Sequence, residues 1–159
     1  MKMKNVAAAL VAAGATLSPM AANAVSVGLE LLLLVDVSGS VSGTEYTLQK
    51  TGYVNAFNSA AVQNAIFGSQ GGAIAVSYAE WSGSSQLSRL VNWTKISTIA
   101  EAQAFATAIN NTTRAFSGNT AIQSAMDNSK ELKQAVLPTA LSRYGRLWTY
   151  QAMGHEMMD

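Results

Sequence analysis

The 159-residue sequence contains no cysteine, one histidine and few charged residues, and these scarcities exclude several classes of protein. Without cysteine, the chain can form neither a disulfide scaffold nor a thiolate metal cluster. Ten Lys and Arg residues nearly balance nine Asp and Glu residues, so charge gives no reason to expect nucleic acid as a partner. The length and the 49% hydrophobic content fit one small globular domain.

The first 24 residues have the features of a secretory signal peptide. Lys2 and Lys4 precede an apolar run over residues 6–17, and a small-x-small pattern ends at Ala24. The run is shorter than a membrane span requires, so we expect cleavage after Ala24 rather than an uncleaved anchor. We therefore expect an exported protein, periplasmic or extracellular, with no membrane span after cleavage.

The rest of the sequence alternates predicted strands with predicted helices. An apolar run over residues 28–35, interrupted only by Glu30, predicts a strand buried on both faces, because it is too short for a buried helix. Cap-type residues then predict a helix to about Ala60. Further elements follow in the order helical turn, strand, short edge strand, helix and helix: residues 62–67, 73–81, 86–91, 99–109 and 121–134. This order predicts an α/β fold, a doubly wound and mostly parallel sheet with helices on both faces.

The motif Asp36-Val37-Ser38-Gly39-Ser40 directly follows the first predicted strand. Open α/β sheets bind ligands at the carboxyl ends of their strands. An extended loop places alternate side chains on one side, so the carboxylate of Asp36 and the hydroxyls of Ser38 and Ser40 can converge. Oxygen ligands suit a hard cation such as Mg²⁺, although the same residue types are also common in ordinary turns.

A second hydroxyl-bearing loop, Gly118-Asn119-Thr120, precedes the last predicted helix. Thr120 either caps that helix or supplies a third hydroxyl to the cation. The sequence contains no evident pair of nucleophile and base, and its single histidine, His155, lies in the tail. We therefore expect a binding protein and no enzyme. A hydrolase that uses Ser38 or Ser40 as nucleophile and a non-functional fragment are the alternatives.

These segments resemble the von Willebrand factor type A (vWA) domain. The motif from Asp36 to Ser40 is similar to the first segment of that family's metal-ion-dependent adhesion site (MIDAS), and Thr120 is similar to the second. Three further segments are more similar still to a bacterial exported branch of undefined function: residues 45–53, 78–83 and 92–96. The likeness spans residues 25–134, for which we expect a partial vWA-like domain.

The resemblance implies a ligand set and a function. Ser38, Ser40 and Thr120 would contact Mg²⁺, or Mn²⁺ or Ca²⁺ in its place, and Asp36 would hold the ion directly or through water. Such domains bind proteins by letting an acidic side chain of the partner occupy the open coordination position. The resemblance therefore implies an exported, Mg²⁺-dependent protein-binding module of adhesion type.

The likeness to the vWA family stops after Gln134. The family's next strand should end in a further aspartate that supports the site, and no such segment follows in this chain. Back-translation of residues 148–159 in a shifted frame permits Asp-Val-Ser-Gly-Asp-Gly, which looks like the missing segment. We therefore expect residues 135–159 to be a tail read out of frame, with ordinary divergence as the alternative. The first strand would then expose an apolar edge, and the incomplete sheet would be marginally stable and prone to aggregate.

Aromatic and acidic residues also occur at the predicted strand ends. We expect Trp81 and Trp93 to pack against the core rather than to form an exposed binding surface. For Glu80 we expect a solvated carboxylate, with approach to the cation as the alternative. Soft-metal binding is a further interpretation of Met153, Met157 and Met158 with His155, but a shifted reading frame would make these residues accidental.

Sequencing the gene again through the codons for Lys130 to Asp159 tests the reading frame. We expect one restored base to bring Asp-Val-Ser-Gly-Asp-Gly into frame after the last predicted helix. If the present codons are found unchanged, the frameshift hypothesis is wrong and the tail is the true product.

Overall fold

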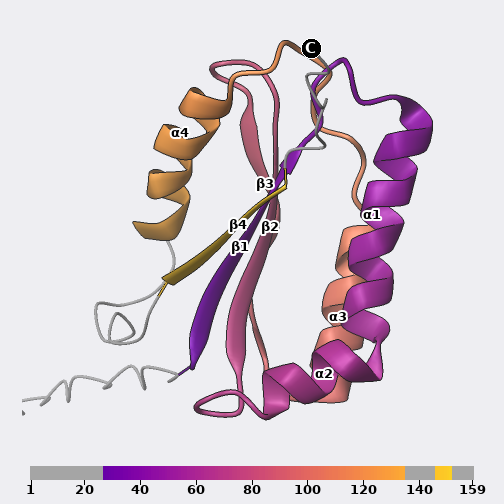
Figure 1. Ribbon diagram of the computed structural model, residues 1–159, viewed down its shortest axis with the longest axis vertical. Coiled ribbons are helices and arrows are strands. Elements are labelled where there is room, and N and C mark those ends of the chain that lie inside the picture. The colour runs from indigo at the N-terminus through magenta and orange to yellow at the C-terminus, as the bar shows by residue number, and fades with distance from the viewer. Residues whose placement is uncertain (1–26, 135–145, 152–159) are drawn as a thin grey trace, which may run out of the picture.

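A four-stranded sheet with the order β3-β2-β1-β4 forms the middle layer of the molecule (Figure 1). The computed structural model describes residues 27–134 and 146–151, so the predicted signal peptide and His155 lie outside the described residues. Two of the three strand pairs are parallel, β1 with β2 and β1 with β4, and the pair of β2 with β3 is antiparallel. The strands have these bounds: β1 Leu29–Asp36, β2 Ile74–Trp81, β3 Leu87–Ile96 and β4 Arg146–Gln151.

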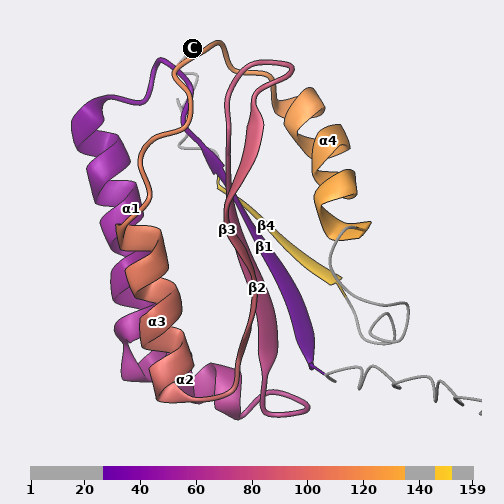
Figure 2. The same cartoon turned by 180° about the vertical axis from the view of Figure 1, so that it is seen from behind.

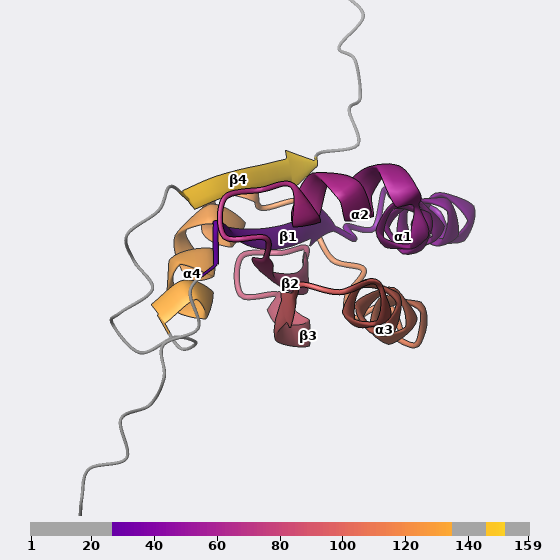
Figure 3. The same ribbon diagram turned by 90° about the horizontal axis from the view of Figure 1, so that it is seen from below.

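Helices cover both faces of the sheet, as Figures 1 and 2 show from opposite sides. The view in Figure 3 separates the layers, with α1 and α3 on one side of the strands and α4 on the other. The helices have these bounds: α1 Gly43–Asn58, α2 Ala60–Phe67, α3 Ile99–Asn110 and α4 Ile122–Gln134. The predicted α/β fold, with a mostly parallel sheet between helices, is confirmed.

The apolar side chains of β1 pack on both faces of the sheet. Because successive side chains of a strand point to opposite faces, Leu33 and Val35 enter the core beneath α1 and α3. Leu32 and Leu34 enter a second core, with Trp81 and Ala125 of α4. The predicted burial of this strand on both faces is therefore confirmed, and so is the packing role of Trp81, which is 0% exposed.

Side-chain caps fix where α1, α2 and α3 begin. Ser42 Oγ accepts a hydrogen bond from the Glu45 amide, and Glu45 Oε2 accepts one from the Ser42 amide, at 3.2 and 2.7 Å. This reciprocal pair starts α1 directly after the Asp36–Ser40 motif. Thr98 Oγ1 accepts in the same way from the amide of Glu101 and starts α3.

The structure differs from the sequence prediction at both edges of the sheet. The edge strand β3 continues to Ile96 and is longer than the short strand predicted at residues 86–91. The expectation that β1 has an uncovered edge is wrong, because β4 pairs with it from Glu30↔Arg146 to Val35↔Gln151. This strand, with the sequence RLWTYQ, contains no carboxylate. Among the described residues, no helix is long and apolar enough to cross a membrane.

The contribution of β4 can be measured by shortening the chain. A chain that ends at Gln134 loses the ladder of hydrogen bonds to β1, and each such bond contributes about 0.5–1.5 kcal/mol net. We expect its free energy of unfolding, from urea titration, to fall by at least about 3 kcal/mol. A chain that ends at Gln151 keeps β4 and is the control. Equal stability of the two shortened chains would contradict the pairing of β4 with β1.

Candidate metal site

In the loop that follows β1, the carboxylate of Asp36 accepts hydrogen bonds from a residue of the same loop. Ser38 donates two hydrogen bonds to Asp36 Oδ1, from its amide at 2.8 Å and from its hydroxyl. Both residues are buried, with Asp36 8% and Ser38 0% exposed. Among the described residues, no donor contacts Asp36 Oδ2. One carboxylate oxygen of Asp36 is therefore held by the loop.

A second segment, residues 112–121, runs from α3 to α4 beside this loop. The Gly39 amide donates to the Gly118 carbonyl at 2.7 Å, which joins the two segments between Ser38 and Ser40. Thr120 follows Gly118 by two residues, so its Cα lies within about 7 Å of the Gly118 Cα. The upper end of the sheet in Figure 1, where β1 and β2 end, therefore carries both predicted ligand segments.

The four predicted ligands are brought together to different degrees. Asp36 and Ser38 are in direct contact. Ser40 and Thr120 are exposed, and neither side chain forms a hydrogen bond to Asp36, Ser38 or the other within the described part of the chain. Among the same described residues, the Thr120 side chain does not cap α4 by a hydrogen bond either.

Glu80 lies behind these two segments and is completely buried. Its Oε1 accepts hydrogen bonds from the hydroxyls of Tyr46 and Tyr78, at 3.0 and 3.1 Å. Its Oε2 accepts from the Ala115 amide at 2.8 Å. The expectation of a solvated carboxylate at this position is wrong, because three donors from β2, α1 and the segment 112–121 replace water.

The two tyrosines act as donors to Glu80 because they remain protonated. Burial, reinforced by the nearby Glu80 carboxylate, raises the pKa of Tyr46 to about 12. The same two causes, burial first, raise the pKa of Tyr78 well above its ordinary value. Both hydroxyls therefore keep their protons, and with them their hydrogen bonds to Glu80, throughout the neutral range.

Arg114 is a further residue of this region that the sequence analysis did not identify. Its Nη2 donates to the carbonyls of Val37 and Ser38, at 2.8 and 2.7 Å, and its Nε donates to the Phe116 carbonyl at 2.9 Å. A lone arginine in a stretch of small polar residues was the available signal. Only the fold reveals its contacts with Val37 and Ser38, because these residues lie 77 and 76 positions away in the chain.

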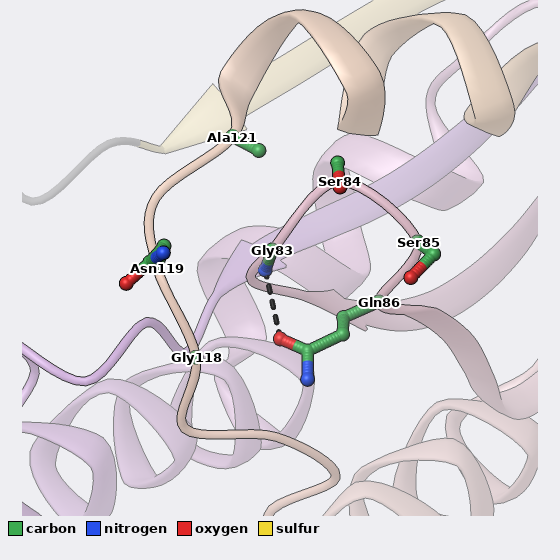
Figure 4. Close-up of a pocket in the computed structure, with 7 residues that line it drawn as sticks. All are labelled: Gly83, Ser84, Ser85, Gln86, Gly118, Asn119 and Ala121. Atoms are coloured by element: carbon green, nitrogen blue, oxygen red, sulfur yellow. Dashed lines mark hydrogen bonds between the residues drawn. The ribbon is translucent and has the colours of Figure 1, made fainter.

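The turn between β2 and β3 holds the end of the second segment. Ser82 accepts from the Ala121 amide at its carbonyl and donates from Oγ to the Asn119 carbonyl, at 3.0 and 3.1 Å. A pocket of about 490 Å³ lies between this turn and residues 118–121. Figure 4 shows the residues that line it. There Gln86 Oε1 accepts from the Gly83 amide at 2.9 Å. A Cβ on Gly118 would lie 2.1 Å from the same oxygen, so a glycine leaves room for Gln86.

The donor set fits a hard cation better than a soft one. The described residues contain no group of three or more His, Cys, Asp or Glu side chains that could hold a metal ion. The candidate ligands are instead one carboxylate and three hydroxyls, from Asp36, Ser38, Ser40 and Thr120. Oxygen ligands with few charges suit Mg²⁺, which retains several waters and accepts a further carboxylate from outside.

Sequence comparison identifies one family. The family described as Protein of unknown function (DUF1194) matches residues 26–143. None of the curated proteins matches the chain in sequence.

Three solved structures are similar to the chain at low sequence identity. The pilus adhesin SpaC from Lactobacillus rhamnosus GG is 19% identical, with a TM-score of 0.48 over 78% of this chain and 15% of that one. Proximal thread matrix protein 1 from the mussel byssus, with a zinc-occupied MIDAS motif, is 15% identical, with a TM-score of 0.48 over 83% and 31%. The vWF domain of the type V pili tip protein Mfa5 from Porphyromonas gingivalis is 12% identical, with a TM-score of 0.42 over 79% and 37%. The chain thus spans well under half the length of each of these proteins.

The close approach of the two segments can be tested with a pair of glycine substitutions. A Cβ on Gly39 would lie 3.0 Å from the Ser117 carbonyl oxygen and 3.4 Å from that of Gly118, so Gly39→Ala must push the segments apart. We expect it to lower the free energy of unfolding by about 1–2 kcal/mol, measured by urea titration. Gly43→Ala is the control, because no atom lies within 4 Å of its Cβ and alanine favours the helix. Equal effects of the two substitutions would contradict this close contact.

Proposed function

The chain belongs to the DUF1194 family of proteins of unknown function, and we propose that it is an exported, Mg²⁺-dependent protein-binding module of adhesion type. In this proposal Asp36, Ser38, Ser40 and Thr120 hold the cation. A partner protein contributes an acidic side chain as a further ligand. The resemblance of the two segments to a MIDAS motivates this ligand set.

The observation that carries the proposal is the hydrogen bond from the Gly39 amide to the Gly118 carbonyl. Gly39 lies between two of the proposed ligands and Gly118 lies two residues before Thr120. One short contact of 2.7 Å therefore supports a common site for residues that are about 80 positions apart in the chain. The location at the carboxyl ends of parallel strands supports the same site.

Each proposed ligand has a distinct task. Asp36 supplies the negative charge and is oriented by the amide and hydroxyl of Ser38. Ser40 and Thr120 face solvent and would complete the protein's share of the ligands from two different segments. When bound, Mg²⁺ supplies a Lewis-acid site for the partner's carboxylate, and Mn²⁺ or Ca²⁺ are the alternatives.

Catalysis by a serine is the competing function. Ser38 is fully buried and directs its proton to Asp36, which leaves little access for a substrate carbonyl. Ser40 is exposed, but no histidine lies among the described residues to activate it.

Export of the protein rests on the signal-like sequence of residues 1–24.

Mg²⁺-dependent stability tests the proposed site. For the chain of residues 25–159, we expect Mg²⁺ at 100 times its Kd to raise the free energy of unfolding by about 2.7 kcal/mol. Asp36→Asn keeps an oxygen that can accept from Ser38 but loses the charge, so we expect it to remove most of this stabilisation. Asp127→Asn is the control, because Asp127 is an exposed carboxylate of α4 paired with Lys130.

Two outcomes would overturn the proposed function. One is stabilisation by Mg²⁺ that is equal in the wild-type, Asp36→Asn and Asp127→Asn chains, because the ion would then bind elsewhere. The other is hydrolysis of a generic ester that does not need Mg²⁺ and is abolished by Ser40→Ala. That result would favour the hydrolase instead.

A further inference from the structure

The segment 112–121, which carries Thr120, has no helix or strand of its own up to α4. Its position therefore depends on contacts with the rest of the chain. At its start, Lys50 Nζ donates to the Thr112 carbonyl at 3.0 Å, and at its end Ser82 binds Asn119 and Ala121. Between these ends, Arg114 and Gly118 contact the loop that contains the motif, and the Ala115 amide contacts Glu80.

Arg114 joins this segment to the loop that contains Asp36. One guanidinium nitrogen donates to two consecutive carbonyls of that loop, those of Val37 and Ser38, while Nε donates to Phe116 in its own segment. The planar guanidinium presents its donors in a fixed geometry, so these three bonds set the spacing between the segments. A lysine has one nitrogen and cannot reproduce this arrangement.

The backbone next to Arg114 is held by the buried carboxylate of Glu80. The next amide, that of Ala115, donates to Glu80 Oε2, and the Tyr46 hydroxyl donates to Oε1. The Arg114 guanidinium carbon lies 5.6 Å from the centroid of the Tyr46 ring. Tyr46 thus contacts the carboxylate through its hydroxyl and the guanidinium through its ring, and it belongs to the first turns of α1.

We propose that Arg114 is a positioning residue for the cation site, which holds the segment of Thr120 at a fixed distance from the loop of Asp36 and Ser38. This inference rests on the proposed function, because it concerns the same ligands. Arg114 does not bind the cation, since both are positive. Its hydrogen bonds direct the carbonyls of Val37 and Ser38 toward itself, while the Ser38 amide donates to Asp36.

Because Arg114 is positively charged, the direction in which its removal changes the Kd for Mg²⁺ distinguishes a charge effect from a positioning effect. If Arg114 acted on Mg²⁺ only through its charge, its removal would reduce repulsion and tighten binding. If it positions the ligands, its removal separates the two segments and weakens binding. We expect Arg114→Gln and Arg114→Lys each to raise the Kd for Mg²⁺ at least tenfold, measured by titration calorimetry. Arg89→Lys is the control, because Arg89 donates to the Leu132 carbonyl away from the site.

Hydrogen exchange of the metal-free protein supplies a readout that does not depend on Mg²⁺. The Gly39 amide is bonded to Gly118, whereas the Val37 amide, two residues earlier, is bonded to the Trp81 carbonyl at 2.9 Å. We expect both Arg114 substitutions to speed exchange at Gly39 at least tenfold and to leave Val37 unchanged. A merely general loss of stability would speed exchange at both amides.

A second pair of variants keeps the inference testable if the Arg114 variants do not fold. Tyr46→Phe removes the bond from α1 to Glu80, whereas Tyr78→Phe removes a bond to the same oxygen from within β2. We expect Tyr46→Phe alone to speed exchange at Ala115 and Gly39. Equal effects of the two tyrosine variants would overturn the inference.

The outcomes separate this inference from the proposed function. If the wild-type protein does not bind Mg²⁺, the proposed function fails, and exchange at Gly39 still decides whether Arg114 holds the segments together. If the wild-type protein binds Mg²⁺ and both Arg114 variants bind it equally or more tightly, the positioning role is wrong while the cation site stands.

Discussion

The buried carboxylate of Glu80 is the constraint on which the candidate site depends. A carboxylate removed from water without donors would cost several kcal/mol, so the fold must supply hydrogen bonds to it. It does so from three parts of the chain: Tyr78 of its own strand, Tyr46 of α1 and the Ala115 amide. Because Ala115 lies beside Arg114, the same requirement brings the segment of Thr120 to the loop of Asp36 and Ser38.

Local patterns were sufficient to predict most of the elements. The apolar run before Asp36 and the abrupt change to Gly and Ser predicted the end of β1 and the start of a loop. Cap-type residues after the motif predicted α1, since a helix leaves its first amides unpaired unless a side chain accepts from them. These predictions succeeded because each depends on residues close together in the chain.

Features that depend on tertiary pairing were not predicted. Glu80 was expected in solvent because acidic residues at strand ends usually are, and only the positions of Tyr46 and Ala115 reverse that expectation. Val37 and Ser38, whose carbonyls accept from Arg114, are far away from it in the chain. β4 was missed because RLWTYQ lacks a long apolar run, yet an edge position beside β1 does not require one. Of the candidate site, the motif was recognisable, whereas the contacts that hold its two segments together were not.

Crystals grown with Mg²⁺, and with Mn²⁺ to locate the ion by anomalous scattering, test most directly whether the two segments form one cation site. We expect a single ion about 2.1 Å from the hydroxyl oxygens of Ser38, Ser40 and Thr120, with Asp36 bound directly or through one water. Arg114 should keep its bonds to the carbonyls of the Asp36 loop. An ion bound elsewhere, or Thr120 directed away from an ion held by Asp36, would contradict a cation site formed by these two segments.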